Sequence, residues 1–317
     1  MIFNNQQLRI ATLGDFSGYY SAFLYGTMEG TIANGAWFRP IDLFKSDIPS
    51  IESQINFFKP HILFCHCIFN EKGPVNRDAL FEMLRKVKKS GVVILYHQGD
   101  ARTTPRFSGN VSEFISGALV NHSMLNEFSD IWKIPCIQWP YGCFIQESLP
   151  DFKNSELICD VAFTGALSDI SGHVHYERSQ FINDLKQGTN LKIKTFPNEF
   201  IGNTRFFTPE LCASAFVQLG VQMALHIPGY LDVRPFQYIG AGGLYFHDSD
   251  LGCFTPGTHY IQYEKGSVES FVKQFNYYKD HPEQAKTIRI KGWGYAQIYH
   301  STQVRMREAI DFARRIS

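Results

Sequence analysis

Two apolar segments in the first third of the chain decide the fold: PHILFCHCIF at residues 60–69 and GVVILYH at residues 91–97. Uninterrupted apolar runs of this length, without alternation, are typical of strands that are covered on both faces. Between them, residues 78–89 predict a helix whose basic end suits the negative pole of the helix dipole. A strand, a helix and a second strand in this order predict a βαβ unit within a mostly parallel sheet.

The same alternation continues on both sides of this unit. Upstream, residues 8–13 predict a strand that ends at Gly14, and residues 20–33 predict a helix. Residues 139–156 are rich in proline, glycine and polar residues, so we place a linker at residues 141–156 between two α/β domains. Downstream, strands are expected at residues 117–121, 135–139, 157–164, 191–195, 214–219 and 243–247, and helices at residues 176–186, 234–238, 267–279, 282–292 and 301–316.

The composition excludes several classes of protein. Of 317 residues, 44% are hydrophobic and 19% are charged, which excludes a disordered tail, a collagen-like repeat and a coiled coil. The 30 basic and 30 acidic residues cancel, so no overall positive field holds nucleic acid, although a local basic groove stays open. Seven cysteines, an odd number, and a start without a basic and apolar leader predict a reduced, cytoplasmic protein. The uncharged residues 211–231 include polar side chains that are costly in lipid, so we interpret them as buried core.

Polar residues follow two of the predicted strands in the first half. In open parallel sheets, ligands bind beyond the carboxyl ends of the strands. Gly14 and Asp15 follow the first strand, where a glycine lets backbone N–H groups approach a ligand. His97 and Asp100 lie at the end of the strand at residues 91–97, and either can act as a general base or hold a substrate hydroxyl. Tight turns also need glycine, and His97 and Asp100 also fit a polar loop with a helix cap, so both interpretations stay open.

A third polar turn lies in the second half. It follows the strand at residues 157–164 and runs through Thr164, Gly165, Ser168, His173 and Arg178. A glycine-rich segment at residues 228–243 carries a second arginine, Arg234. Both arginines follow a turn and begin a helix, and two guanidinium groups near glycine loops and helix N-termini suit a diphosphate. The alternative is a pair of surface salt bridges.

Three short patterns raise the question of a metal. Cys65-His66-Cys67 lacks a second ligand pair, so we interpret it as buried cysteines in a strand. His173-Val174-His175 fits contact with phosphate or sugar, or simple loop polarity, better than metal binding. Asp248-Ser249-Asp250 matches a DxD pattern that can hold a divalent ion on a nucleotide-sugar, but its place after the glycine-rich turn favours an ordinary loop. The P-loop, G-x-G-x-x-G and G-x-S-x-G motifs are missing from the sequence, which disfavours ATPase, nicotinamide and α/β-hydrolase functions.

The second half resembles a known family. The segments DVAFTGALSD and YERSQFINDL (residues 160–169 and 176–185), LDVRPFQYIGAGGLYFHD (residues 231–248) and YHSTQVRMREAIDF (residues 299–312) are similar to the C-terminal half of GT-B glycosyltransferases of the group 1, spore-protein-like type. The resemblance implies an α/β, GT-B-like fold: two Rossmann-like domains with mostly parallel sheets and an interdomain cleft. It also implies that residues 301–317 pack back on the N-terminal domain. The sequence departs from the family at Gln237, where the family usually has Glu.

The resemblance also implies a function. The implied function is that of a glycosyltransferase that moves a sugar from a nucleoside-diphosphate sugar, taken to be a UDP-sugar, to an acceptor hydroxyl. No cofactor or metal is expected to be required. Residues 157–300 would bind the donor, and residues 1–140 would bind a glycan, a small molecule or a nucleobase as acceptor. The expected catalytic residues are Asp15, His97 and Asp100, and the expected donor-binding residues are Gly14, Thr164, Gly165, Ser168, His173, Arg178, Tyr230, Arg234, Gln237, Tyr238, Gly242 and Gly243.

Two other functions stay open. The departure at Gln237 makes a non-catalytic protein that binds a sugar-nucleotide or a glycan conceivable. A glycosyltransferase that modifies a hydroxylated base in DNA, as in phages, would need a local basic groove and would bind DNA with a strong salt dependence. The residues that can form such a groove are Lys192, Lys194 and Arg205, or Arg102 and Arg106.

Overall fold

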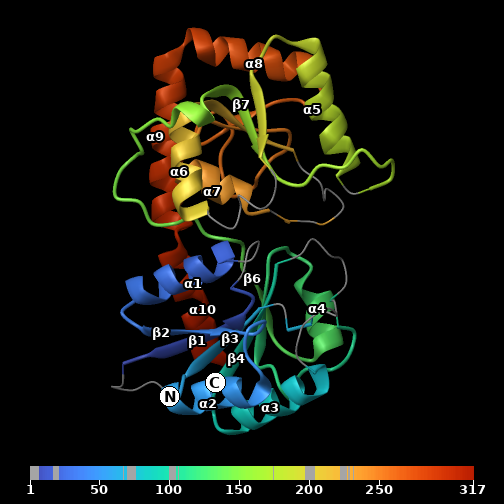
Figure 1. Cartoon of the computed structure of the whole chain (residues 1–317), viewed down its shortest axis with the longest axis vertical. Helices are drawn as coiled ribbons and strands as arrows, with labels where there is room; N and C mark the ends of the chain where they lie inside the picture. The colour runs from blue at the N-terminus through green and yellow to red at the C-terminus, as the bar shows by residue number, and fades with distance from the viewer. Residues whose placement is uncertain are drawn as a thin grey trace. The chain divides into compact units, whose positions relative to one another are not determined.

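The chain divides into two compact units, each built on its own parallel sheet (Figure 1). Unit 1 comprises Met1–Tyr141, His226–Asp232 and Thr302–Ser317, and unit 2 comprises Gly142–Leu225 and Val233–Ser301. The computed structural model describes residues 7–16, 21–66, 68–69, 76–99, 105, 107–173, 175–196, 204–221, 227, 229–230 and 232–317. The predicted α/β class with two Rossmann-like, parallel sheets is confirmed.

Unit 1 has a six-stranded sheet in the order β2-β1-β3-β4-β5-β6, with every neighbouring pair parallel. The strands are β1 (Arg9–Gly14), β2 (Trp37–Asp42), β3 (Ile62–Cys65), β4 (Val93–Gln98), β5 (Gly117–Val120) and β6 (Cys136–Gln138). The helices are α1 (Ser21–Ala33), α2 (Ile48–Phe58), α3 (Arg77–Lys89), α4 (Leu125–Trp132) and α10 (Thr302–Ile316).

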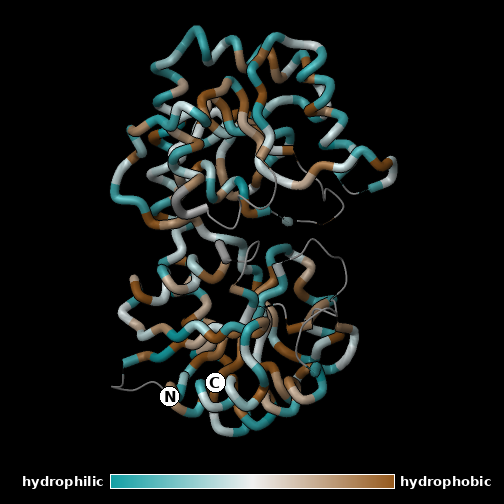
Figure 2. Tube along the Cα trace, in the orientation of Figure 1, coloured by the Kyte–Doolittle hydropathy of each residue, from teal (hydrophilic) through white to brown (hydrophobic). Residues whose placement is uncertain are grey.

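Each face of this sheet is covered by helices, which accounts for its continuous apolar strands. On one face, α2, α3 and α4 pack against alternate residues of β1, β3, β4 and β5. On the other face, α10 packs with Trp139 and with the intervening strand residues, and α10 contacts α1. Trp139 Nε1 donates a hydrogen bond of 2.7 Å to the Arg305 carbonyl oxygen of α10, so the last helix of the chain is an integral part of unit 1. The apolar strands at the centre of both units stand out in Figure 2.

Unit 2 has a five-stranded parallel sheet in the order β11-β10-β9-β7-β8. The strands are β7 (Cys159–Thr164), β8 (Ile193–Phe196), β9 (Ala215–Gly220), β10 (Tyr245–His247) and β11 (Ile261–Gln262). The helices are α5 (Tyr176–Gly188), α6 (Thr204–Ser214), α7 (Arg234–Gly240), α8 (Val268–Asp280) and α9 (Pro282–Tyr299). α5, α8 and α9 share one core with the sheet, while α6 and α7 contact β9.

The two sheets have the same strand order relative to the chain. In each, the first strand lies between the second and the third, so the winding direction reverses beside it: between β1 and β3 in unit 1 and between β7 and β9 in unit 2. Ligands of open α/β sheets bind at the carboxyl ends of the strands on either side of this switch point. A ligand site is therefore expected beside Gly14 and His66 in unit 1, and beside Thr164 and Val221 in unit 2.

The segment after unit 1's last strand lies on unit 2. Cys143 N donates a hydrogen bond of 2.8 Å to the His300 carbonyl oxygen, and Gln297 Nε2 donates one of 3.0 Å to the Phe144 carbonyl oxygen. These bonds hold part of the predicted linker against α9. Among the helices that the structure describes, none is both long and apolar enough to cross a membrane.

Candidate functional site

The carboxyl end of β7 is held to the start of α5 by Arg178. This side chain is 1% exposed, and its Nη1 and Nη2 donate to the carbonyl oxygens of Ala166 (3.3 Å) and Val221 (3.5 Å). Ala166 lies in the turn after β7, and Val221 follows β9. The guanidinium group of Arg178 therefore bridges the two strand ends that flank the switch point of unit 2.

Gly165 makes this position of the guanidinium group possible. Its φ of +145° is rarely adopted by residues with a side chain. A Cβ at this position would lie 3.3 Å from Arg178 Nη1 and 3.0 Å from Phe163 Cζ. The turn is fixed further along by Ser168, whose N–H donates a 2.7 Å hydrogen bond to Ser179 Oγ in the first turn of α5.

A second buried arginine shares the same aromatic ring. Arg234, the first residue of α7, is 6% exposed, and its Cζ lies 5.4 Å from the centroid of the Phe163 ring. The Cζ of Arg178 lies 5.2 Å from that centroid. Contact of a guanidinium group with an aromatic face is favourable, but two buried cations near one ring repel each other. An anion bound between them would remove that repulsion.

The electrostatic effect of this pair is visible at His175, which directly precedes α5. Burial, followed by the charges of Arg178, His173 and Arg234, lowers the pKa of His175 to about 4. The imidazole is therefore neutral at pH 7, and the positive charge at the carboxyl edge of β7 belongs to the two arginines. A local field of this kind favours a ligand with more than one negative charge, such as a diphosphate.

One face of α7 extends the site. Arg234, Gln237 and Tyr238 are three and four residues apart and so lie on the same side of the helix. The Tyr238 hydroxyl is hydrogen-bonded to Thr164 Oγ1 at the end of β7. The Gln237 side chain is buried and forms no hydrogen bond within the part of the chain that the structure describes. Gln237 can therefore bond a ligand hydroxyl beside the two arginines.

Other predicted donor-binding residues lie elsewhere. Gly242 and Gly243 precede β10 and lie at the amino edge of the sheet, opposite to Thr164, because α7 runs back across the sheet from Arg234. Their packing explains why they are glycines: a Cβ on Gly242 would overlap Leu149, and one on Gly243 would overlap Gln218. Of the remaining two residues, Tyr230 belongs to unit 1, and His173 is exposed with its ring centroid 5.0 Å from that of His175.

In unit 1, the carboxyl edge of the sheet contains two stacked histidines. His66 directly follows β3 and His97 lies in β4, and their Nδ1 atoms are 3.3 Å apart. Both rings are buried and stack on Phe23 of α1, with ring centroids 4.5 and 4.4 Å away. Gly14 lies against His66: a Cβ built on Gly14 would be 3.3 Å from His66 Cβ. The sheet thus brings a predicted glycine and a predicted base to its switch point.

His97 has the properties of a neutral base. Burial, together with the neighbouring His66, lowers the pKa of His97 well below 6.5. Its Nδ1 is engaged with His66, and its Nε2 has no hydrogen-bond partner among the residues described. When Nδ1 carries the ring proton, Nε2 is a free lone pair that can accept a proton from a hydroxyl.

The sequence predicts two carboxylates, Asp15 and Asp100, as catalytic residues besides His97. Asp15 follows Gly14 at the same edge and is half-buried, whereas Asp100 lies outside the described residues. Two aromatic residues with clear roles were not predicted: Phe163, which both arginines contact, and Phe23, which orders the histidine pair. His66 was considered only as part of a cysteine-flanked triplet, and its pairing with His97 was missed.

The carboxylates of the Asp248-Ser249-Asp250 pattern have partners within their own loop. Within the described ranges, no group of three or more His, Cys, Asp or Glu residues is arranged to hold an ion. Asp248 is buried after β10, with its Oδ1 3.8 Å from His247 Nδ1 and hydrogen-bonded to Ser249 Oγ at 3.0 Å. The Asp250 carboxylate accepts a 2.9 Å hydrogen bond from Gly252 N, so it caps a turn of its own loop.

Part of the chain matches a known family model. Residues 180–311 match the family model described as glycosyl transferase-like, a range that includes α7 and most of α5 and α10. No curated protein gives a match to the chain. This segment is therefore similar to glycosyltransferases, as the sequence predicts, and the spore-protein-like subtype stays a prediction.

Solved structures support the same fold over nearly the whole chain. The chain is similar to a glycosyltransferase from Rickettsia africae, at 9% identity with a TM-score of 0.58, covering 99% of both chains. It is similar to HepE of Anabaena in complex with UDP-glucose, at 10% identity and TM-score 0.58, covering 96% of this chain and 100% of HepE. It is also similar to the T4 phage β-glucosyltransferase in complex with UDP-glucose, at 12% identity and TM-score 0.61, covering 96% and 99%. These likenesses establish that the fold is that of GT-B glycosyltransferases.

Proposed function

We propose that this protein transfers a sugar from a UDP-sugar to an acceptor hydroxyl, and that Arg178 and Arg234 bind the diphosphate. The observation that carries the proposal is the pair of buried guanidinium groups that share the Phe163 ring at the switch point of unit 2. The choice of UDP is supported by the complexes of HepE and of the T4 phage β-glucosyltransferase with UDP-glucose.

The reaction develops negative charge where the arginines lie. The bond between the anomeric carbon and the diphosphate oxygen breaks, its electron pair moves onto that oxygen, and the acceptor oxygen forms the new bond. Preorganised donors aimed at the leaving diphosphate stabilise the transition state more than the ground state. Gly165 and Ser168 would border the phosphates, while Gln237 would bond a ribose hydroxyl through its amide.

Unit 1 would bind the acceptor, with His97 as the base. The proton of the acceptor hydroxyl would move to Nε2 of the neutral imidazole as the new glycosidic bond forms. His66 would act as a positioning residue, since its Nδ1 contact fixes the orientation of the His97 ring. Asp15 is a further candidate for orienting the acceptor, as it follows Gly14 at the same sheet edge.

We further propose that turnover needs no divalent ion. Two arginines can balance the charge of a diphosphate, and the Asp250 carboxylate is already engaged in a turn. The test is release of UDP from UDP-glucose with purified protein, measured with and without EDTA. We expect equal rates in both conditions. Loss of activity in EDTA that Mn²⁺ or Mg²⁺ restores would contradict this proposal and make Asp248 and Asp250 the first candidates for metal ligands. No turnover of any UDP-sugar would favour a non-catalytic binding protein instead.

A hydroxylated base in DNA is the second candidate acceptor. The observation that favours it is the similarity to β-glucosyltransferase, which is a DNA modifying enzyme. The same turnover assay separates the acceptors when it is run with hydroxylated DNA in one arm and simple glycans in the other. Incorporation of sugar into DNA that falls steeply with salt would select the DNA acceptor.

We also propose a cytoplasmic location. The cysteines that the structure describes are free thiols. Burial raises the pKa of Cys136 and Cys212 to about 12, so these thiols stay protonated and unreactive at neutral pH. Free, protonated cysteines are typical of a reducing compartment.

A further inference from the structure

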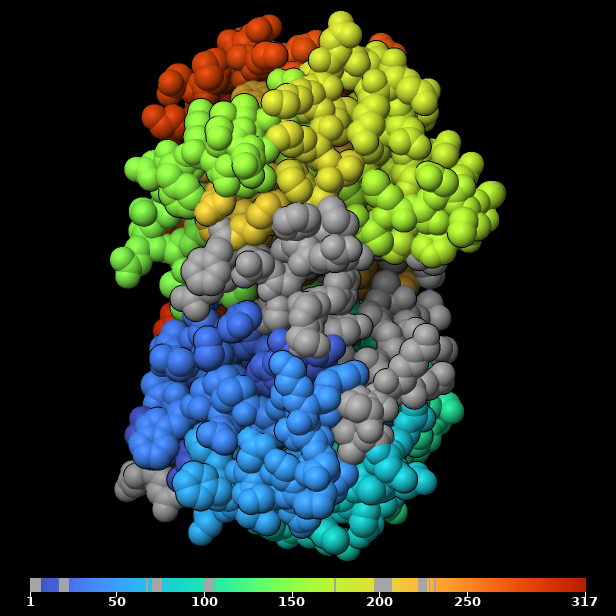
Figure 3. Space-filling view, in the orientation of Figure 1, coloured from blue at the N-terminus to red at the C-terminus, as the bar shows by residue number. Residues whose placement is uncertain are grey.

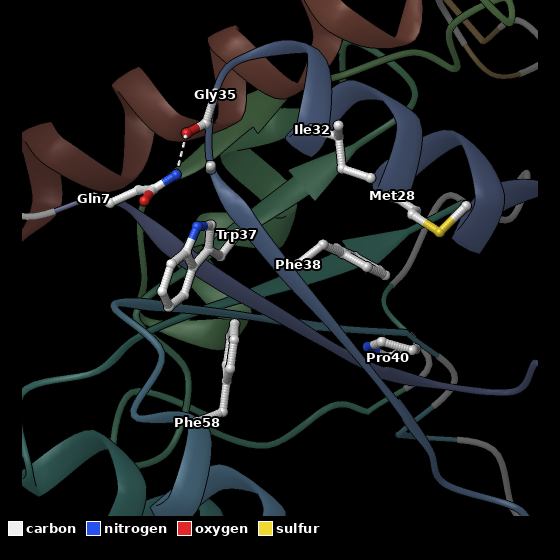
Figure 4. Close-up of a pocket in the computed structure, with 9 residues that line it drawn as sticks. Gln7, Met28, Ile32, Gly35, Trp37, Phe38, Pro40 and Phe58 are labelled. Atoms are coloured by element: carbon white, nitrogen blue, oxygen red, sulfur yellow. Dashed lines mark hydrogen bonds between the residues drawn. The ribbon is translucent and has the colours of Figure 1, made fainter.

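An apolar groove follows the edge strand of unit 1, away from both sites described above (Figure 4). It has a volume of about 660 Å³, and its apolar lining includes Met28, Ile32, Trp37, Phe38, Pro40 and Phe58. Trp37 is 57% exposed and Ile32 59% exposed, and Phe57, next to Phe58 at the end of α2, is 86% exposed. The described residues among the first 60, in blue in Figure 3, form a large part of the visible face of unit 1. Exposed apolar surface of this kind marks an interaction site.

The edge strand itself is poorly suited to pairing with another strand. Trp37 N and Leu43 N donate inward, to the carbonyl oxygens of Leu8 and Gly14, both at 2.8 Å. Alternate residues along β2 therefore direct their N–H groups outward, and one of these residues is Pro40, which has no N–H. A proline on the outer side of an edge strand prevents strand addition. The groove must be occupied through side chains rather than through backbone pairing.

Three cations are neighbours of lining residues, in the sequence or in the strand register. Arg9 lies beside Trp37 in the parallel register, and Arg39 lies between two lining residues of β2. Lys59 follows Phe58, and its carbonyl oxygen accepts a 2.7 Å hydrogen bond from Arg9 Nε. None of these three side chains forms an ion pair with any residue in the described part of the chain. Arg9 bonds His61, and Arg39 bonds Gln54, both of which are neutral partners.

This charge pattern decides between the possible occupants. A second copy of the chain, seated on the same surface by two-fold symmetry, would bring the three cations of each copy together, and like charges oppose such a contact. An anionic partner would neutralise them. Exposed Trp, Phe and Ile side chains beside unpaired Arg and Lys are the residue types that insert at the boundary between lipid headgroups and acyl chains.

We propose that this surface, made by Ile32, Trp37 and Phe57 with Arg9, Arg39 and Lys59, docks unit 1 on an anionic lipid bilayer. The aromatic and aliphatic side chains enter the acyl boundary, the groove accommodates part of an acyl chain, and the three cations bind headgroup phosphates. The inference does not depend on the proposed transfer reaction, because no residue of this surface belongs to either site.

The test is sedimentation of the full-length protein with vesicles. One set is pure phosphatidylcholine, and the other contains about one third phosphatidylglycerol. We expect binding to the anionic vesicles alone. The double variant Trp37→Ser with Phe57→Ser should weaken this binding by more than about tenfold. The double variant Arg39→Gln with Lys59→Gln should weaken it by about fivefold for each charge removed.

Matched controls come from unit 2. Ile298→Ser with Tyr299→Ser removes two similarly exposed apolar side chains, and Lys286→Gln with Lys291→Gln removes two exposed cations of α9. Both controls should bind vesicles like the wild type. All four variants should release UDP from UDP-glucose in solution at the wild-type rate, since these side chains are exposed and remote from both sites. Brominated acyl chains should quench the fluorescence of Trp37 in the wild type, and Trp37→Phe should remove that quenching.

Three outcomes overturn the proposal. The first is wild-type protein that stays in the supernatant with anionic vesicles, or vesicle binding that the surface variants do not weaken. The second is a concentration-dependent dimer, without vesicle binding, that Trp37→Ser with Phe57→Ser dissociates, because it would assign the surface to a second copy. The third is surface-dependent binding to polyglutamate without vesicle binding, which would assign it to an acidic protein.

Discussion

Replacing Arg234 with alanine is expected to lower kcat by about 10²–10³, the usual effect of removing one preorganised donor from a developing oxyanion. Arg234 is buried against Phe163 next to Arg178, and charge grows on the diphosphate as the glycosidic bond breaks. The contact should therefore strengthen toward the transition state. Affinity for UDP should fall as well. Steady-state kinetics with UDP-glucose, and calorimetric titration with UDP, measure the two effects separately.

Two further variants show whether the effect is specific. Arg234→Lys keeps the charge but loses the two parallel N–H donors, so it should recover only part of the rate. Arg289→Lys is the matched control: Arg289 donates a 2.6 Å hydrogen bond from Nε to the Gly242 carbonyl oxygen, at the amino edge of the sheet. It should lower the melting temperature while UDP affinity stays near wild type. A folded Arg234→Ala protein that turns over and binds UDP like the wild type would show that the diphosphate binds elsewhere.

Replacing His97 with glutamine is expected to lower kcat by about 10²–10⁴, the contribution of a positioned general base. The pH profile of the wild type should show whether His97 is this base. Because burial and His66 hold the pKa of His97 well below 6.5, the base stays neutral from pH 6.5 upward, and the acid limb of kcat/KM should lie below pH 6.5. An ordinary histidine would already lose activity around pH 6.5.

His66→Gln tests whether the neighbouring ring sets the pKa of His97. It removes the neighbouring imidazole that helps to lower the pKa of His97, so the acid limb should move to higher pH, while the rate at pH 8 should fall less than in His97→Gln. The sign of the stability effect follows from the same shift. The unfolded chain binds a proton at His97 that the folded chain does not, so the free energy of unfolding should decrease as the pH falls below about 6.5. Full activity in His97→Gln would exclude His97 as the base.

Much of the fold could be predicted because its strands are apolar throughout. β3 and β4 are buried on both faces, and an apolar run such as GVVILYH has few stable alternatives to a buried strand. β2 was not predicted, since WFRPID contains Pro40 and half of its residues are exposed at the sheet edge. α6 was missed for a similar reason: Pro209 lies inside it and obscures its helical pattern.

The candidate site was predictable where it depends on strand ends, and not where it depends on how elements pack. Thr164, Arg178 and Arg234 are marked by a strand end and by helix starts, which are local signals. The pairing of His66 with His97 joins residues 31 positions apart and exists only because β3 and β4 are neighbours. The direction of α7 likewise separates Gly242 from Arg234, although both lie in one continuous sequence segment.

The central claim is that the diphosphate of a UDP-sugar binds at the carboxyl edge of unit 2, between Arg178 and Arg234. Hydrogen exchange of the backbone amides, measured by mass spectrometry with UDP and with uridine, tests this location directly. UDP should slow exchange in the turn at residues 165–168, in the first turn of α5 and in α7, and uridine should leave the turn and α5 unchanged because it lacks the phosphates. Protection by UDP confined to the turn at residues 240–243, or to unit 1, would contradict the account.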